Sequence, residues 1–129
     1  MKAVVADTHA IHWFLENDSR LSPAAGEAMD TAAKIWVPAI CLVEITYLIE
    51  KGRVHPAVMP RLLDEFDNPA TTLQLANLDL GVSRALQFIS RNDVPDMPDR
   101  IIAATAWFNG LPLVTRDRRI QSCGIETIW

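Results

Sequence analysis

Hydrophobic and polar positions alternate along the chain between short apolar runs and longer segments with helical periodicity. Short apolar runs bounded by turn residues are typical of buried strands, whereas apolar residues three and four apart are typical of helices. The pattern predicts strands at 2–6, 35–37, 71–75, 113–115 and 126–128. It predicts helices at 9–15, 22–33, 38–49, 56–66, 80–90 and 98–109.

Capping signals support several of these helix boundaries. Ser22 followed by Pro23 is typical of an N-cap and a first helical residue. Gly52 is placed to close the helix at 38–49, and Gly110 to stop the helix at 98–109. Strands that alternate with helices predict right-handed crossovers and a mostly parallel sheet covered on both faces.

Composition narrows the class of protein. The 129 residues, 50% of them hydrophobic, predict one domain over 1–129 with a core that needs no disulfide or structural metal. Twelve Lys and Arg against sixteen Asp and Glu give a net charge of −4, which excludes a basic coat that wraps nucleic acid. No apolar run reaches the roughly 18 residues of a membrane span. Cys41 and Cys123 lack zinc or redox spacing, which predicts free thiols in a reducing cytoplasm.

Acidic residues stand where two predicted strands end. Asp7 follows the first strand and Asp117 follows the fourth. In open parallel sheets, ligands bind beyond the carboxyl ends of the strands. Each residue also has a structural interpretation: Asp7 as the N-cap of the next helix, and Asp117 as a turn residue paired with a neighbouring arginine.

Glu44 is the only charged side chain in the fifteen residues 35–49. Its neighbours three and four residues away on a helix are Ile40, Cys41, Tyr47 and Leu48. A carboxylate buried there costs several kcal/mol unless it is paired or coordinated. A ligand role is therefore favoured over a hydrogen bond to Tyr47 or a buried arginine.

Two further acids open the last long helix. Asp96 and Asp99 have the spacing of a capping box, and acidic residues are favoured at a helix N-terminus. Capping needs only one of them. If Asp96 is the N-cap, Asp99 is left able to face the cleft.

The joint placement of Asp7, Glu44, Asp99 and Asp117 is more informative than any one of them. Four carboxylates that converge repel one another unless cations lie among them. Mg²⁺ or Mn²⁺ suits such oxygen ligands, and these ions can activate a water for displacement at phosphorus. The three histidines are too scattered for a zinc site. The four tryptophans are predicted to be core or dimer contacts rather than a base-stacking platform.

Four segments together resemble a PIN domain, and more narrowly a VapC-type toxin of a type II toxin–antitoxin pair. The likeness extends from Val4 to Trp129. The segments are Asp7-Thr8-His9 after an apolar strand, Glu44 within an apolar helix, residues 96–106, and Leu113-Val114-Thr115-Arg116-Asp117.

The resemblance implies a three-layer α/β/α sandwich with a mostly parallel sheet of four to five strands. It implies an endoribonuclease that uses Mg²⁺ or Mn²⁺ and a metal-activated water to hydrolyse RNA. The metal and catalytic residues would be Asp7, Glu44, Asp99 and Asp117. Outer residues would be Asp96, Thr8 and Thr115, and an RNA-binding rim would comprise Arg116, Arg118 and Arg119. Expected partners are a cognate antitoxin and a second copy of the chain, in the cytoplasm.

Two other classes stay open at this stage. One is a catalytically inactive PIN-like module that binds nucleic acid or an antitoxin; four intact acids argue against it. The other is a receiver-type signalling domain that binds Mg²⁺. It would need adjacent acids near the first strand and a lysine after the last, whereas the only lysines are Lys2, Lys34 and Lys51.

Overall fold

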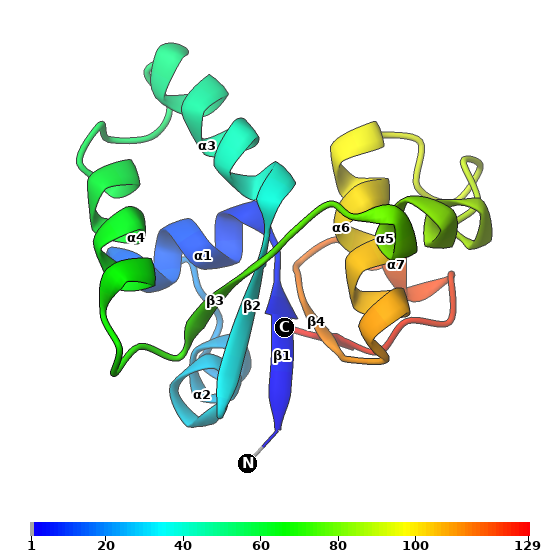
Figure 1. Ribbon diagram of the computed structural model, residues 1–129, viewed down its shortest axis with the longest axis horizontal. Helices are drawn as coiled ribbons and strands as arrows, with labels where there is room; N and C mark the ends of the chain where they lie inside the picture. Colours follow the sequence, from blue (N-terminus) through cyan, green and yellow to red (C-terminus); the bar gives the residue numbers. More distant parts are fainter. Residues whose placement is uncertain (1) are drawn as a thin grey trace.

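A single parallel sheet organises the computed structural model, which describes residues 2–129 (Figure 1). Its spatial order is β3-β2-β1-β4-β5, and every neighbouring pair is parallel. The strands are β1 (Ala3–Ala6), β2 (Lys34–Pro38), β3 (Leu73–Ala76), β4 (Leu113–Val114) and β5 (Thr127–Ile128). All five predicted strands are therefore confirmed, with differences of one or two residues at their ends.

Seven α-helices connect these strands. They are α1 (Thr8–Leu15), α2 (Pro23–Thr31), α3 (Ala39–Glu50), α4 (Val58–Asp67), α5 (Leu80–Ala85), α6 (Met97–Asn109) and α7 (Arg118–Gln121). The six predicted helices are present, although the one at 80–90 is α-helical only to Ala85 and continues as a 3-10 turn, η1 (Leu86–Phe88). The sequence pattern missed α7, because four residues are too few to show a helical period.

Helices cover both faces of the sheet. Figure 1 shows α1 to α4 on one side and α5, α6 and α7 on the other. Right-handed crossovers require this arrangement, since the chain moves from β1 towards β3 in one direction and then returns to β4 and β5. The α/β/α sandwich is confirmed. Among residues 2–129, no helix combines the length and hydropathy needed to cross a membrane.

The predicted capping residues act as the sequence indicated. The Ser22 hydroxyl accepts a hydrogen bond from the Ala25 amide at 3.1 Å, and Pro23 begins α2. Gly110 ends α6 with a φ of 63°, a left-handed conformation that favours glycine. These local contacts fix where α2 begins and where α6 ends.

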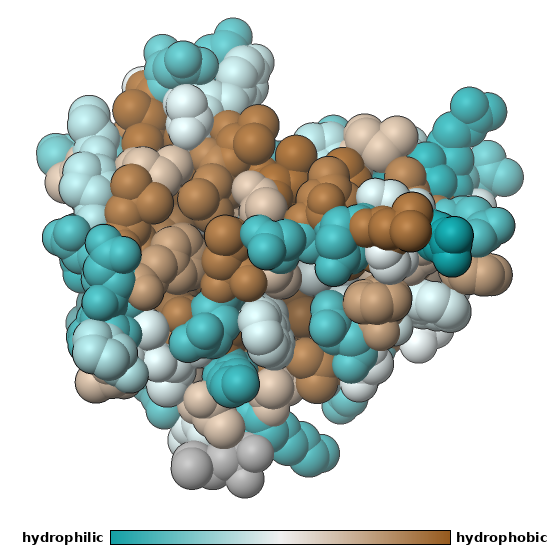
Figure 2. Space-filling view, in the orientation of Figure 1, coloured by the Kyte–Doolittle hydropathy of each residue, from teal (hydrophilic) through white to brown (hydrophobic). Residues whose placement is uncertain are grey.

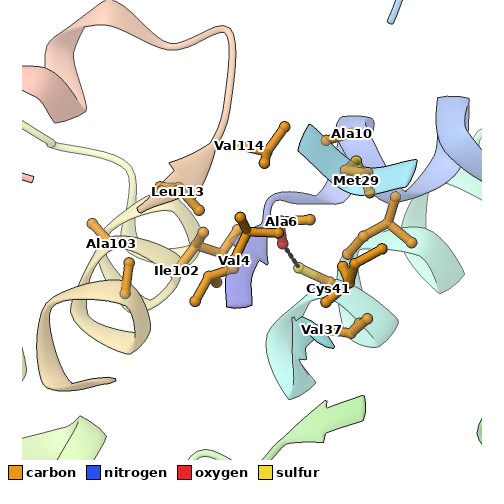
Figure 3. Packing of buried hydrophobic residues seen from close by; sticks show 14 of the residues in the cluster. Val4, Ala6, Ala10, Met29, Val37, Cys41, Ile102, Ala103, Leu113 and Val114 are labelled. Carbon is orange, nitrogen blue, oxygen red and sulfur yellow. Dashed lines mark hydrogen bonds between the residues drawn. The ribbon is translucent and has the colours of Figure 1, made fainter. Parts of the chain in front are cut away.

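The hydrophobic core lies on both faces of β1. Val5 and Ala6 have no exposed surface, and neither do Cys41 on α3 and Leu113 on β4. Figure 3 shows Cys41 reaching the backbone of Ala6, where its Sγ lies 4.0 Å from the carbonyl oxygen, while Ile102 approaches from α6. Side chains from α3 and α6 thus pack on the two faces of β1, next to Asp7, the residue that follows the strand.

The strand order reverses between β1 and β4. At such a switch point, the connections leave the two strands towards opposite faces and open a crevice at their carboxyl ends. The amide of Asp7 donates to the carbonyl of Val114 at 3.1 Å. This bond extends the β1–β4 ladder and fixes Asp7 at the mouth of the crevice.

Candidate active site

Asp7 and Asp117 lie at the ends of β1 and β4, and each also begins a helix. Asp7 Oδ1 accepts a hydrogen bond from the Ala10 amide at 2.9 Å, which confirms its role as the N-cap of α1. Asp117 Oδ1 accepts from the Arg119 amide at 2.9 Å and begins α7. The alternative that Asp117 pairs with a neighbouring arginine was wrong: its bond is to backbone, and within residues 2–129 it forms no ion pair.

Glu44 projects from α3 towards α1. The Thr8 hydroxyl donates a hydrogen bond of 2.6 Å to Glu44 Oε1. The side chain is half-buried rather than fully buried, and neither Tyr47 nor a buried arginine is its partner. Thr8, which was expected to be an outer residue, therefore holds one oxygen of Glu44 in place.

Asp96 and Asp99 divide their roles at the start of α6. Asp96 is exposed, and its Oδ2 accepts a hydrogen bond from the Asp99 amide at 3.2 Å, so it is the N-cap. The Asp99 side chain is half-buried, and its carboxylate makes no hydrogen bond with the described part of the chain. The cap thus leaves both oxygens of Asp99 available to a ligand.

Three of the predicted acids line one pocket of about 220 Å³. Its lining is Asp7, His9, Asp99, Arg116, Asp117 and Trp129. Glu44 is not part of this lining, but its charge acts on Asp99, as does that of Asp96. The structure thus groups Asp7, Asp99 and Asp117 in one pocket, and Glu44 and Asp96 lie near enough for their charges to act on Asp99.

Proton affinities reflect this crowding. Burial, followed by the nearby carboxylates of Asp96, Glu44, Asp117 and Asp7, raises the pKa of Asp99 to about 7. Burial is also the main cause that raises the pKa of Asp7, against opposing hydrogen bonds from Thr115 and the Ala10 amide. Burial and the charge of neighbouring carboxylates thus make Asp7 and Asp99 easier to protonate.

Burial likewise raises the pKa of Glu44, and the hydrogen bond from Thr8 opposes this effect. Among residues 2–129, the ion pairs are His12 with Glu16 and Arg20 with Asp18. None involves a candidate site acid. The cluster therefore has a deficit of positive charge that its own side chains do not meet.

The donor chemistry fits a divalent cation. Glu44 and Asp117 each commit one carboxylate oxygen to a structural hydrogen bond and keep the other free of bonds within the described chain. Asp7 accepts from the Ala10 amide, and Thr115 also forms a hydrogen bond with its side chain. Hard oxygen donors of this kind suit Mg²⁺ or Mn²⁺. As the side chains stand in residues 2–129, no three His, Cys, Asp or Glu groups are gathered closely enough to hold a metal. Coordination of one ion by three of these acids would need their carboxylates to lie closer together.

Three exposed arginines follow β4. Arg116 lines the acidic pocket itself, whereas Arg118 lines a neighbouring pocket. Arg119 contributes its backbone amide to the Asp117 cap. The Asp117 amide donates to the Thr115 hydroxyl at 3.0 Å, so Thr115 stabilises the turn that contains these arginines.

Two residues of the acidic pocket were not predicted to be there. His9 is exposed beside Asp7 on α1, and Trp129 is half-buried after β5. Trp129 was predicted to be a core or dimer contact, and it does pack against the hydrophobic core while it also lines this pocket. Its place depends on the pairing of β5 with β4, a contact that no local sequence signal encodes.

Comparisons with known proteins identify the family of the chain. A model of the PIN domain family matches residues 4–125. The chain is 31% identical over 122 residues to Ribonuclease VapC22 of Mycobacterium tuberculosis, which covers 95% of this chain and 92% of that protein.

Solved structures share the fold at much lower identity. VapBC2 from Rickettsia felis, bound to a DNA fragment from its promoter, superposes with a TM-score of 0.71 at 13% identity and covers 97% of this chain and 96% of that chain. FitAcB from Neisseria gonorrhoeae gives a TM-score of 0.64 at 17% identity, covering 96% and 95%. A toxin–antitoxin complex from Klebsiella pneumoniae gives 0.62 at 19% identity, covering 88% and 86%.

Proposed function

The chain belongs to the PIN-domain family and is VapC-like, and from this premise we propose that it is a metal-dependent endoribonuclease and the toxin of a toxin–antitoxin pair. One observation carries the chemical part of the proposal. Asp99 lies among four other carboxylates that help raise its pKa to about 7, with no ion pair to any of them in the described residues. The name of the mycobacterial relative, a ribonuclease, supports RNA as the substrate.

Asp7, Glu44, Asp99 and Asp117 would hold Mg²⁺ or Mn²⁺. When bound, such an ion lowers the pKa of a water ligand and stabilises charge on a phosphoryl oxygen. The residues contribute fixed oxygen donors. The Ala10 amide orients Asp7, the Thr8 hydroxyl orients Glu44, and the Arg119 amide orients Asp117.

Asp96, Thr8 and Thr115 have supporting roles in this proposal. Asp96 holds the first turn of α6 and adds negative charge beside Asp99. Arg116, Arg118 and Arg119 offer guanidinium groups for RNA phosphates at the mouth of an otherwise acidic site. Arginine suits this task because its planar group donates two parallel hydrogen bonds to a phosphate.

Partners are part of the same proposal. The structural neighbours include toxin–antitoxin complexes, which supports an antitoxin as a partner. Large apolar side chains are exposed on α3 and α5, among them Val43, Tyr47 and Leu80, and Figure 2 shows hydrophobic atoms across this face. Such a patch favours contact with another chain, and we propose a second copy there. Tyr47→Lys should then reduce the molar mass measured by light scattering from dimer to monomer.

A cytoplasmic location is also proposed, and the free thiols of Cys41 and Cys123 support it.

RNA cleavage with and without divalent ions tests the function. Purified protein incubated with total RNA should cleave it in Mg²⁺ or Mn²⁺ and not in EDTA. Asp7→Asn should abolish cleavage, whereas Asp64→Asn, on an exposed acid of α4, should not. Binding of RNA without cleavage in either ion would instead favour the alternative of a non-catalytic PIN-like module.

A further inference from the structure

Trp13 on α1 has unusual surroundings for a buried side chain. It is 2% exposed but lies outside the main hydrophobic cluster. The ring centroids of His9 and Trp129 lie 5.3 and 5.8 Å from its own. The guanidinium carbons of Arg20 and Arg116 lie 5.0 and 4.9 Å from the same ring. Two cations and two aromatic rings thus bury this indole at the margin of the acidic pocket.

The two arginines on Trp13 differ in what else they bind. Arg20 donates from Nε and Nη2 to both carboxylate oxygens of Asp18, at 3.1 and 2.8 Å. Arg116 forms no ion pair or side-chain hydrogen bond within residues 2–129, although it lines the pocket that holds the acids. Stacking on an indole holds a guanidinium through its face and leaves the N–H edge free for another ligand. Arg116 is therefore positioned by Trp13 and still able to bind a ligand through its N–H groups.

Arg116 and Trp129 stand between two adjoining pockets. The acidic pocket, of about 220 Å³, also contains His9 and the three carboxylates. The second pocket, of about 210 Å³, shares Arg116, Asp117 and Trp129 with it. Its other lining residues are Thr115, Arg118, Gln121 and Thr127. One pocket is rich in carboxylates, and the next offers an aromatic ring, a second arginine and neutral hydrogen-bonding groups.

We propose that Trp129 and His9 form a nucleobase-stacking subsite beside the acidic cluster, with Arg116 contacting the adjoining phosphate. The proposal rests on the ribonuclease function proposed above and adds the residues that position the substrate. Bases stack on aromatic side chains when they are unpaired, and stacking tolerates any base because each has a π-face. Trp129 is half-buried and His9 is exposed, and both line the pocket that contains the acids, whereas the buried Trp13 packs against both rings.

Binding of two model ligands tests the subsite without cleavage. The probes are a fluorescein-labelled oligouridylate and an abasic ribose-phosphate chain of the same length, measured by anisotropy in EDTA. Wild-type protein should bind the oligouridylate about tenfold or more tightly than the abasic chain. Trp129→Ala should remove most of this difference, and Trp129→Phe should retain it. Arg116→Ala should weaken both ligands to a similar extent.

Arg20→Ala is the matched control, since Arg20 stacks on the same indole but does not line the acidic pocket. It should leave both affinities unchanged. If Trp129→Ala fails to fold, as judged by circular dichroism, His9→Ala on the exposed side of α1 should reduce the preference for bases instead.

The outcomes separate this proposal from the function itself. Cleavage of RNA together with an undiminished base preference in both Trp129→Ala and His9→Ala would overturn the subsite and leave the ribonuclease intact. A wild-type protein that neither binds nor cleaves RNA would overturn both.

Discussion

The core on the two faces of the sheet and the acidic cluster at the carboxyl ends of its strands are neighbours in the chain but meet opposite physical requirements. Ala6 has no exposed surface, and the next residue, Asp7, faces the pocket. In the core, burial of apolar side chains stabilises the fold. At the cluster, burial and like charge raise the pKa of Asp7 and Asp99, so their charged forms are disfavoured there. The cluster depends on the core for its position, and in the proposed function a bound cation balances its charge.

Helix α3 contains this contrast within three consecutive residues. Val43 is 62% exposed, Glu44 is half-buried at the cluster, and Ile45 has no exposed surface. These three residues are adjacent on one helix but differ in burial and in their relation to the cluster. Substitutions at Val43 and Ile45 therefore test stability, whereas a substitution at Glu44 tests chemistry.

The largest effect on stability is expected at Ile45. Truncation to alanine removes a fully buried side chain and leaves a cavity, which should lower the free energy of unfolding by about 2–5 kcal/mol. In the monomeric Tyr47→Lys protein, Val43→Ala should change it by less than about 0.5 kcal/mol, because surface substitutions remove little buried area. Urea unfolding followed by circular dichroism measures both. Equal losses at the two positions would contradict the burial of this face of α3.

The largest effect on chemistry is expected at Glu44. Glu44→Gln keeps the shape of the side chain and its acceptor for Thr8 but removes one charge. Replacing outer partners of a metal ligand costs about 10–100-fold in activity, so replacing a ligand should cost at least about 100-fold. The variant should stay folded, and without metal it should be at least as stable as the wild type because repulsion is relieved.

Glu50→Gln on the same helix is the control for this substitution, since Glu50 is exposed and outside the cluster. Initial rates of RNA cleavage in Mn²⁺ should be normal for Glu50→Gln. Normal rates for Glu44→Gln would remove Glu44 from the set of metal ligands.

Sequence reasoning succeeded where the signal is local. The caps of α2 and α6 and the apolar run of β1 give these elements, and a parallel sheet follows from their alternation. It failed for α7, whose four residues carry only the Asp117 cap as a signal. The place of Trp129 against Trp13 joins residues more than a hundred positions apart, so no local pattern predicts it.

For the site, sequence predicted that acids from separate elements come together but not how each is held. That Asp7 would cap α1 followed from its position. The bond from Thr8 to Glu44 could not be predicted, because it depends on how closely α1 and α3 pack. The exposed half of Glu44 was also missed, since the apolar neighbours of α3 suggested full burial. Such features depend on tertiary packing.

The stability of the metal-free protein should depend on pH through Asp99. Asp99, with its pKa raised to about 7, binds a proton more readily in the folded than in the unfolded protein. Its contribution to stability is therefore fully present below its usual pKa and is lost as the pH rises through 7. In EDTA, the melting temperature should be higher at pH 6 than at pH 8, and Asp99→Asn should reduce this difference.

Mg²⁺ should oppose this pH dependence of the melting temperature. Binding displaces the proton and adds stability by ligand linkage, so millimolar Mg²⁺ should raise the melting temperature more at pH 8 than at pH 6. Isothermal titration calorimetry in two buffers of different ionisation enthalpy would count the protons released at pH 7. A melting temperature unaffected by both Mg²⁺ and Mn²⁺ would contradict a metal site in this cluster.

The smallest effect is expected at the rim, where Arg118 is exposed and lines the pocket beside the acids. If its guanidinium neutralises one RNA phosphate, Arg118→Ala should lower the slope of log affinity against log salt by roughly 0.7 for a single strand. The rate at saturating RNA should not change, because Arg118 does not line the acidic pocket. Arg91→Ala, on an exposed arginine before α6, should leave the slope as it is. Anisotropy titrations at four or more salt concentrations resolve a change of this size. An unchanged slope for Arg118→Ala would mean that this side chain is a solvated turn residue and would remove it from the proposed RNA-binding rim.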